Sequence, residues 1–336
     1  LIRHGFDVTV LDTGFFKDGI LFPPSMVRTV FKDARDVQGG DLKGVDAVVH
    51  LAGISNDPFG NLSVEKIYDP TRRYARDIAM LCKKKGIRFI FASSCSVYGK
   101  GSDAVLDEDS SVTPQTPYSI NKLQIEGDLR MLADKTFSPI ALRFATAFGV
   151  SPRMRFDIVI NMLVGMAVAE KKIVLNSDGQ AWRPHVHIND IAESLLCALR
   201  FPYTDGGLLI LNVGREDNNM KIIDTAKIVG EECGNIPISF MTGASGENDL
   251  IKSTRIGMSG EDTRTYRVSF KKIKEYFPEF ECPYSIRAGV REMIEKFIRI
   301  KLDRATLNDP KFYRLQALEK LFQGGKINDD LRGVTQ

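Results

Sequence analysis

Three side chains have the types and the spacing that hydride chemistry on an alcohol or ketone needs. Tyr118 and Lys122 stand four positions apart in TPYSINKLQIEGD, and a helix starting at the proline would place both on one face. Ser94 ends the apolar stretch RFIFASS about two dozen residues earlier. A Tyr118 phenolate would take the proton of a substrate hydroxyl, Ser94 would orient that oxygen, and a nicotinamide cofactor would accept the hydride.

The phenol of Tyr118 must become acidic for this chemistry. An ordinary tyrosine has a pKa of ~10, so half ionisation at neutral pH requires roughly 4 kcal/mol of preferential stabilisation of the phenolate. The ammonium of Lys122 and an oxidised nicotinamide would supply it. The tyrosine–lysine spacing alone is a weak signal because the chain has nine tyrosines. The serine-rich segment before it argues against a chance match.

The elements that must position these residues follow a βαβ rhythm. Short apolar runs predict strands, and amphipathic stretches such as residues 74–85 predict helices between them. The predicted strands are VTVLD (8–12), AVVHLAG (47–53), RFIFASS (88–94) and PIALRFA (139–145). This alternation predicts an α/β fold, a doubly wound parallel sheet of Rossmann type.

The chain is expected to divide into interleaved lobes. Residues 1–149 are predicted to form the dinucleotide-binding domain, to which residues 183–213 return as a strand and a helix. Residues 150–182 and 214–295 would form a smaller α/β substrate lobe. Residues 296–336 are predicted to form a helical extension. One face of this extension is apolar, with Phe312, Leu315, Leu318 and Phe322, so we expect it to dock on the body of the protein or on a neighbouring subunit.

The first twelve residues resemble the second half of a dinucleotide-binding unit. LIRHGFDVTVLD predicts a helix end, a turn at Gly5 and a strand ending in Asp12, so the first strand and the glycine-rich loop are expected before Leu1. Asp12 would bind the cofactor ribose, and its charge would favour NAD over NADP. Asp33, with the adjoining Ala34, would contact the adenine edge. Alternatively, both carboxylates are solvated loop residues that bind no cofactor.

Composition excludes several other classes of function. The 46 Lys and Arg nearly balance the 43 Asp and Glu, so the charge makes no case for nucleic acid or an anionic membrane. No segment has the length and apolarity of a membrane helix, which predicts a soluble protein. Five scattered cysteines favour free thiols and a cytoplasmic location. His185 and His187 alternate along one segment without a third ligand, so no metal site is expected.

The motifs ASSCSVYG, YSINK, HLAG and RPHVHINDIAE resemble those of the extended short-chain dehydrogenase/reductase family, in its NAD-dependent sugar epimerase/dehydratase branch. The resemblance implies NAD as cofactor, a nucleotide-diphosphate sugar as substrate, a homodimer, and Ser94, Tyr118 and Lys122 as catalytic residues, which would also contact the cofactor. Further cofactor contacts are implied for Leu51, Ala52, Gly53, Phe144 and Ala145. Substrate contacts are implied for Ser96, Thr146, Asn161, Arg183 and Arg264, although an exposed arginine is often only a solvated charge.

Departures from the family pattern bear on the reaction. The 4,6-dehydratases of the family carry Asp and Glu after the catalytic hydroxyl, where this chain has Cys95 and Ser96. Cys95 should point away from Ser94 on an extended strand and is expected to pack in the core. We therefore expect a C4 epimerase that works through a keto intermediate. A 4-dehydrogenase or ketoreductase, a 4,6-dehydratase and a non-catalytic NAD-binding Rossmann protein remain as alternatives.

Overall fold

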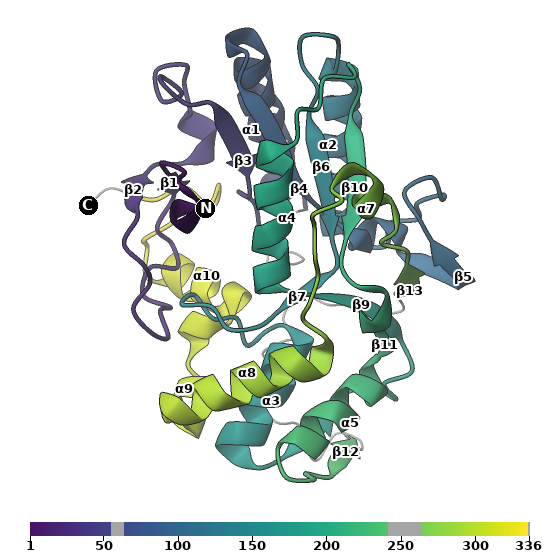
Figure 1. The fold of residues 1–336 in the computed structure, drawn as a ribbon. Helices are drawn as coiled ribbons and strands as arrows, with labels where there is room; N and C mark the ends of the chain where they lie inside the picture. Colours follow the sequence, from purple (N-terminus) through teal and green to yellow (C-terminus); the bar gives the residue numbers. More distant parts are fainter. Residues whose placement is uncertain (55–63, 241–263, 335–336) are drawn as a thin grey trace.

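The computed structural model describes residues 1–54, 64–240 and 264–334. Its centre is a four-stranded parallel sheet with the strand order β3-β4-β6-β10 (Figure 1). The strands are β3 (Ala47–His50), β4 (Arg88–Ser94), β6 (Ile140–Phe144) and β10 (Leu209–Val213). β3, β4 and β6 confirm three of the strands predicted from apolar runs.

Helices cover both faces of this sheet, as Figure 1 shows. α1 (Val64–Lys85) and α2 (Pro117–Leu132) lie together on one face, and α4 (Ile188–Arg200) lies on the other. Because successive side chains of a strand point to opposite faces, Phe89 and Phe91 of β4 enter the core beneath α1 and α2, whereas Ile90 enters the core beneath α4. The predicted doubly wound arrangement is confirmed.

The first residues form a separate small sheet beside this one. β1 (Thr9–Asp12) confirms the predicted strand and pairs in parallel with β2 (Arg28–Phe31). A 3-10 turn, η1 (Ile2–His4), ends at Gly5, whose φ of 82° lies in the left-handed region that glycine tolerates. η2 (Ala34–Asp36) follows β2. The expected first strand and glycine-rich loop before Leu1 stay a prediction.

Below the main sheet in Figure 1, further helices and strands pack around an apolar core of their own, and we call this part of the structure the second lobe. Its helices are α3 (Val159–Glu170), α5 (Ile222–Glu232), α8 (Ile286–Arg299) and α9 (Arg304–Leu307). β8 (Ile173–Leu175) pairs with β12 (Ile238–Phe240). None of the helices in the described ranges combines the length and the apolar character that crossing a bilayer requires.

Two further small sheets contain most of the remaining strands. β9 (Trp182–His187) pairs with β7 (Thr146–Phe148) and β11 (Asn219–Lys221), and β5 (Lys100–Leu106) pairs with β13 (Thr265–Val268). The remaining short elements are η3 (Cys95–Tyr98), η4 (Glu216–Asn218), α7 (Lys272–Tyr276) and η5 (Pro310–Phe312). The predicted strand and helix of residues 183–199 are present as β9 and α4, and the chain then returns to the main sheet as β10.

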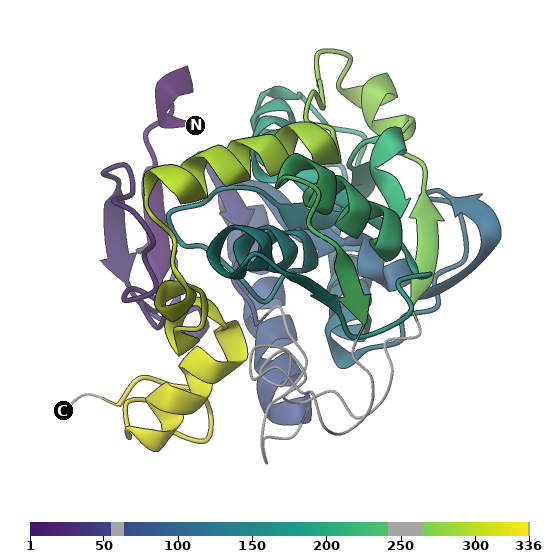
Figure 2. The same cartoon turned by 90° about the horizontal axis from the view of Figure 1, so that it is seen from below.

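The C-terminal extension docks on the body of the same chain. α10 (Arg314–Gln323) buries Leu315 and Leu318 in one apolar cluster with Ile67 and Tyr68 of α1. Figure 2 shows the yellow C-terminal helix beside the blue helix α1. The prediction that the extension has a single apolar face is wrong in part. Phe312 lies in η5, where the different backbone turns its ring into the core of the second lobe, and Phe322 at the end of α10 remains 38% exposed. The predicted boundary at 295/296 falls inside α8.

Candidate active site

Ser94 is the last residue of β4 and caps the turn that follows. Its Oγ accepts a hydrogen bond of 3.1 Å from the backbone N–H of Ser96, which turns the chain into η3. Extended backbone therefore stops at Ser94, and strand alternation does not extend to Cys95. Cys95 is nevertheless fully buried, with its Sγ 3.1 Å from the carbonyl oxygen of Arg143, so its predicted place in the core is confirmed.

Tyr118 and Lys122 lie in the first turns of α2. The helix begins with a capping box, in which the Thr116 hydroxyl accepts from the N–H of Ser119 and the Ser119 hydroxyl accepts from the N–H of Thr116. Lys122 Nζ lies 5.6 Å from the centre of the Tyr118 ring and donates a 2.6 Å hydrogen bond to the carbonyl oxygen of Ala92 in β4. The structure thus brings Tyr118 and Lys122 to the end of β4, where Ser94 lies.

Burial opposes charge on both titratable members of this group. Burial raises the pKa of Tyr118, while a hydrogen bond with Ser94 and then the charges of three arginines lower it in part. Burial also lowers the pKa of Lys122 to about 8, against the attraction of Glu126. Desolvation is the largest of the effects on Tyr118, so an acidic phenol requires the additional positive charge that an oxidised nicotinamide would bring.

A buried polar network supports the end of β4 from behind. Glu126 lies one turn after Lys122 and forms a two-pronged ion pair of 2.9 and 2.7 Å with Arg143 of β6, with both side chains at most 4% exposed. Glu126 also accepts a 2.5 Å hydrogen bond from the hydroxyl of Ser93, the residue before Ser94. Sequence reasoning missed this pair, although the four-residue spacing from Lys122 to Glu126 was a usable signal.

The residues predicted to hold the adenosine part of the cofactor lie in and after the small sheet. Asp12 ends β1, and its carboxylate accepts a 2.6 Å hydrogen bond from the N–H of Gly14. Asp33 accepts from the N–H and the guanidinium of Arg35, and these bonds lower its pKa although burial raises it. Ala34 begins η2 and is half-buried.

The remaining predicted cofactor residues follow strands of the main sheet. Leu51, Ala52 and Gly53 come directly after β3, where Leu51 is 59% exposed and Gly53 has a φ of 152°. Phe144 ends β6, and Ala145 is buried with its N–H bonded to the carbonyl oxygen of Val213. The carboxyl ends of parallel strands share one edge, which is where α/β sheets bind ligands. The exposed Leu51 after β3 and the Asp12 carboxylate at the end of β1, in the neighbouring small sheet, fit this mode of NAD binding.

Two of the predicted substrate residues, Asn161 and Arg183, form hydrogen bonds with other groups of the same chain. Asn161 in α3 accepts from the N–H of Gly149 and donates to the carbonyl oxygen of Arg155, so it ties down the loop between β7 and α3. Arg183 in β9 donates to the carbonyl oxygens of Trp182 and Arg264. These bonds use both ends of the Asn161 amide.

The other predicted substrate residues are Ser96, Thr146 and Arg264. Ser96 is buried, and its hydroxyl has no hydrogen-bond partner among the described residues. Thr146 begins β7 two residues after the end of β6. Arg264 precedes β13, and its charge lowers the pKa of Tyr118. The two residues of the DTRTYRV motif before Arg264 lie outside the described residues.

Sequence reasoning also missed a group of arginines around the start of α2. Arg155 and Arg314 both act on the Tyr118 phenol electrostatically. Arg155 forms a two-pronged ion pair of 2.9 Å with Asp157, and Arg153 lies two positions earlier. The two arginines of SPRMRFD were a visible signal, whereas nothing local links Arg314 in α10 to this place.

The two histidines of β9 serve packing. His185 and His187 are buried, and both contact the ring of Phe148. Burial lowers the pKa of each to about 4, so both are neutral at physiological pH. Within the described ranges, no group of three or more His, Cys, Asp and Glu side chains is arranged to hold a metal ion.

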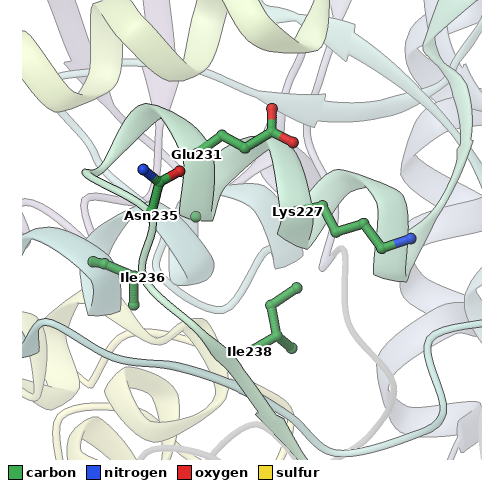
Figure 3. A pocket seen from close by; sticks show the side chains of 6 residues that line it. Lys227, Glu231, Asn235, Ile236 and Ile238 are labelled. Atoms are coloured by element: carbon green, nitrogen blue, oxygen red, sulfur yellow. The ribbon is translucent and has the colours of Figure 1, made fainter.

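A surface depression lies far from these residues, between α5 and β12 (Figure 3). Lys227, Glu231, Asn235, Ile236 and Ile238 surround it, together with the backbone at residue 230. The lysine and the glutamate already form ion pairs with other side chains of the protein. We therefore assign no part of the site to this depression.

The chain resembles known proteins in sequence and in structure. The uncharacterized UDP-glucose epimerase YtcB of Bacillus subtilis (strain 168) is 28% identical over 186 residues, 54% of this chain and 58% of that protein. UDP-glucose 4-epimerase 3 of Oryza sativa subsp. japonica is 25% identical and aligns with 71% of this chain and 74% of its own. The chain thus spans a little over half of the first relative and about three quarters of the second.

Solved structures share the fold. The structure of UDP-glucuronic acid 4-epimerase from Bacillus cereus in complex with NAD has a TM-score of 0.70 at 19% identity, over 89% of this chain and 93% of that one. MoeE5 in complex with UDP-glucuronic acid and NAD has a TM-score of 0.68 at 24% identity, with the same coverage.

The match to a family model is the most direct of these findings. Residues 1–214 match the model described as the NAD dependent epimerase/dehydratase family. This range contains the Ser94, Tyr118 and Lys122 group and every strand of the main sheet. It confirms the family and the NAD cofactor that the motifs indicated. The chain belongs to the NAD-dependent epimerase/dehydratase family.

Proposed function

We propose that the protein is an NAD-dependent epimerase of nucleotide-diphosphate sugars, acting at the C4 hydroxyl of the sugar. The observation that carries this proposal is the convergence of Ser94, Tyr118 and Lys122 at the carboxyl end of β4. The names of the relatives, which include UDP-glucose 4-epimerases, support the same reaction.

Each of the three residues has a distinct task. Tyr118 takes the proton of the C4 hydroxyl and returns it to the keto oxygen when hydride comes back to the other face of the sugar. Ser94, hydrogen-bonded with the phenol, holds that oxygen in line. Lys122 stabilises the phenolate by its charge. The chemistry that NAD supplies when bound is reversible hydride transfer.

The residues after Ser94 favour epimerisation over dehydration. Elimination of water needs an additional acid and base beside the sugar. Cys95 is buried in the core, and burial raises the pKa of its thiol, so it does not ionise at neutral pH. Ser96 offers only a hydroxyl. A 4-dehydrogenase or ketoreductase would use the same three residues and differs only in whether the hydride returns to the same sugar.

The test is an assay of the purified chain with NAD against a panel of UDP-, GDP-, CDP- and dTDP-sugars, with sugar products and NADH both measured. Epimerisation predicts a C4 epimer without net NADH. Net NADH would indicate a dehydrogenase, and a 4-keto-6-deoxy product would indicate a dehydratase. Binding of NAD without turnover of any sugar would support a non-catalytic role.

Tyr118→Phe provides the mechanistic control for this assay. Loss of the phenolic proton should reduce kcat by roughly 10² to 10⁴-fold, while NAD binding is kept. The matched control is Tyr276→Phe, which removes a hydroxyl far from the sheet edge. Full turnover of Tyr118→Phe would contradict the mechanism.

The division of labour between the lobes belongs to the same proposal. Residues 1–149 bind NAD, and residues 150–182 and 214–295 form the lobe that binds the nucleotide sugar. The substrate contacts come from both parts of the chain: Asn161 and Arg264 belong to that lobe, whereas Ser96, Thr146 and Arg183 reach the sugar nucleotide from outside it. A homodimer forms through α1 and α2, on which Met80, Ile120 and Met131 are exposed. Light scattering coupled to size exclusion tests the dimer, and Met131→Glu should weaken it.

The proposed location is the cytoplasm. All five cysteines are free thiols, which fits a reducing compartment. Fractionation of the source cells, with detection by antibody, tests this location, and recovery outside the cytoplasmic fraction would contradict it.

A further inference from the structure

Three arginines from two distant parts of the sequence lie close together around Phe16 and Asp157. We call Arg153, Arg155 and Arg314 the arginine cluster. Arg153 and Arg155 belong to the loop before α3, and Arg314 is the first residue of α10. The guanidinium groups of Arg153 and Arg314 lie 5.0 and 4.5 Å from the centre of the Phe16 ring, so both make cation–π contacts with the same ring.

Two carboxylates of the described residues, Asp157 and Asp12, act on these three arginines. Asp157 is its buried carboxylate, and both Asp157 oxygens accept from Arg155, while one also accepts from the backbone N–H of Arg314. The Nε of Arg153, the Nη2 of Arg153 and the Nε of Arg314 are buried without an acceptor among the described residues. Buried charge and unused donors are costly, and an anion would satisfy both.

The cluster lies within electrostatic reach of two residues of the predicted site, Asp12 and Tyr118. The carboxylate of Asp12, at the end of β1, attracts both Arg153 and Arg314. Arg155 and Arg314 act on the Tyr118 phenol. The mutual repulsion of the arginines, after burial, keeps the pKa of Arg314 well below its ordinary value. A bound anion would relieve this repulsion.

We propose that the arginine cluster is a binding site for a diphosphate group, and that the C-terminal extension supplies Arg314 to it. Guanidinium groups suit phosphoryl oxygens because they donate paired hydrogen bonds in a fixed plane. A diphosphate also carries enough charge to balance more than one arginine. Both NAD and a nucleotide-diphosphate sugar contain this group, so the chemistry is shared between the two ligands of the proposed function.

This assignment gives the C-terminal extension a role in ligand binding beyond docking. Leu315 and Leu318 fix α10 against α1, and this contact holds Arg314 beside Phe16 and Asp157. The family match ends at residue 214, so it does not cover this arginine. The inference rests on the proposed function for its choice of ligand, and its test does not depend on turnover.

The experiment is calorimetric titration of the full chain with inorganic pyrophosphate, ADP, NAD and UDP. We expect Arg314→Gln to weaken pyrophosphate binding by roughly 10 to 100-fold, as loss of a charge-assisted hydrogen bond predicts. Arg314→Lys should restore part of the affinity. A loss confined to ADP and NAD identifies the cofactor as the source of the diphosphate, and a loss confined to UDP identifies the sugar nucleotide.

Arg304→Gln is the matched control, because Arg304 lies in the same extension with a side chain that is 75% exposed. If Arg314→Gln binds pyrophosphate, ADP and UDP as tightly as Arg304→Gln does, the site is refuted. Arg153→Gln gives a second test should Arg314→Gln fold poorly, and unchanged binding by that variant also refutes the site. A chain that binds pyrophosphate through Arg314 but epimerises no sugar would refute the proposed function and leave the site standing.

Discussion

The buried ammonium group of Lys122, which the proposed reaction requires, should lower the free energy of unfolding of the protein. Its side chain is 7% exposed, and burial lowers its pKa from 10.5 to about 8. At about 1.36 kcal/mol per pKa unit, this difference corresponds to roughly 3 kcal/mol against the folded state at pH 7. Lys122→Met removes the buried charge and also removes the hydrogen bond to Ala92, worth about 1 kcal/mol. We therefore expect the free energy of unfolding of Lys122→Met to exceed that of the wild type by about 2 kcal/mol, and we expect the variant to have no turnover.

The pH dependence of this gain gives the sharper test. Below about pH 8 the lysine is charged in both the folded and the unfolded chain, and the cost is complete. Between about pH 8 and 10.5 the unfolded chain binds a proton that the folded chain has released, so the stability of the wild type rises with pH. The advantage of Lys122→Met should therefore shrink by about 2 kcal/mol between pH 7 and 10.

Urea unfolding of the wild type and Lys122→Met at both pH values measures this effect. Lys227→Met is the control, because that side chain is 58% exposed and its replacement should change stability by less than ~0.5 kcal/mol at either pH. A Lys122→Met variant that is less stable than the wild type at pH 7, or an advantage that is equal at pH 7 and 10, would refute the reasoning.

Three further changes test buried charges and one strained glycine of the fold. Glu126→Gln should destabilise the protein by about 3 to 5 kcal/mol, because Arg143 remains buried without its carboxylate. Asp190→Asn should stabilise it by about 1 to 3 kcal/mol at pH 7 and little at pH 4, since burial raises the pKa of Asp190 to about 6 and its contribution is lost as the pH rises through that value. Gly149→Ala should lower the free energy of unfolding by more than ~2 kcal/mol, because the φ of Gly149 is 116° and a methyl group there would clash with the imidazole of His187. Gly127→Ala is the control: this glycine lies inside α2 with no neighbour that a methyl group would meet, so the substitution should raise the free energy of unfolding by ~0.5 kcal/mol or more.

Urea or thermal unfolding reads out all three. Glu126→Gln within 1 kcal/mol of the wild type would mean that Arg143 finds another partner. An Asp190→Asn effect of equal size at pH 4 and 7 would assign it to packing instead of charge. Equal effects of the two glycine substitutions would contradict the clash inferred at Gly149.

Much of the main sheet was predictable because its signals are local. The apolar runs of β3, β4 and β6 and the spacing of Tyr118 and Lys122 depend only on neighbouring residues and on the period of a strand or a helix. Parallel strands then bring their carboxyl ends to one edge. The approach of Ser94 to Tyr118 follows from that rule.

The sequence by itself therefore determined the family, the doubly wound architecture and the three residues proposed to handle the proton. Only the tertiary structure decided their electrostatic state. Burial raises the pKa of Tyr118 and lowers that of Lys122, and this depends on atoms from several elements. The structure alone also decided that Arg314 joins Arg153 and Arg155, since more than 150 residues separate them and no periodic pattern carries a contact over that distance.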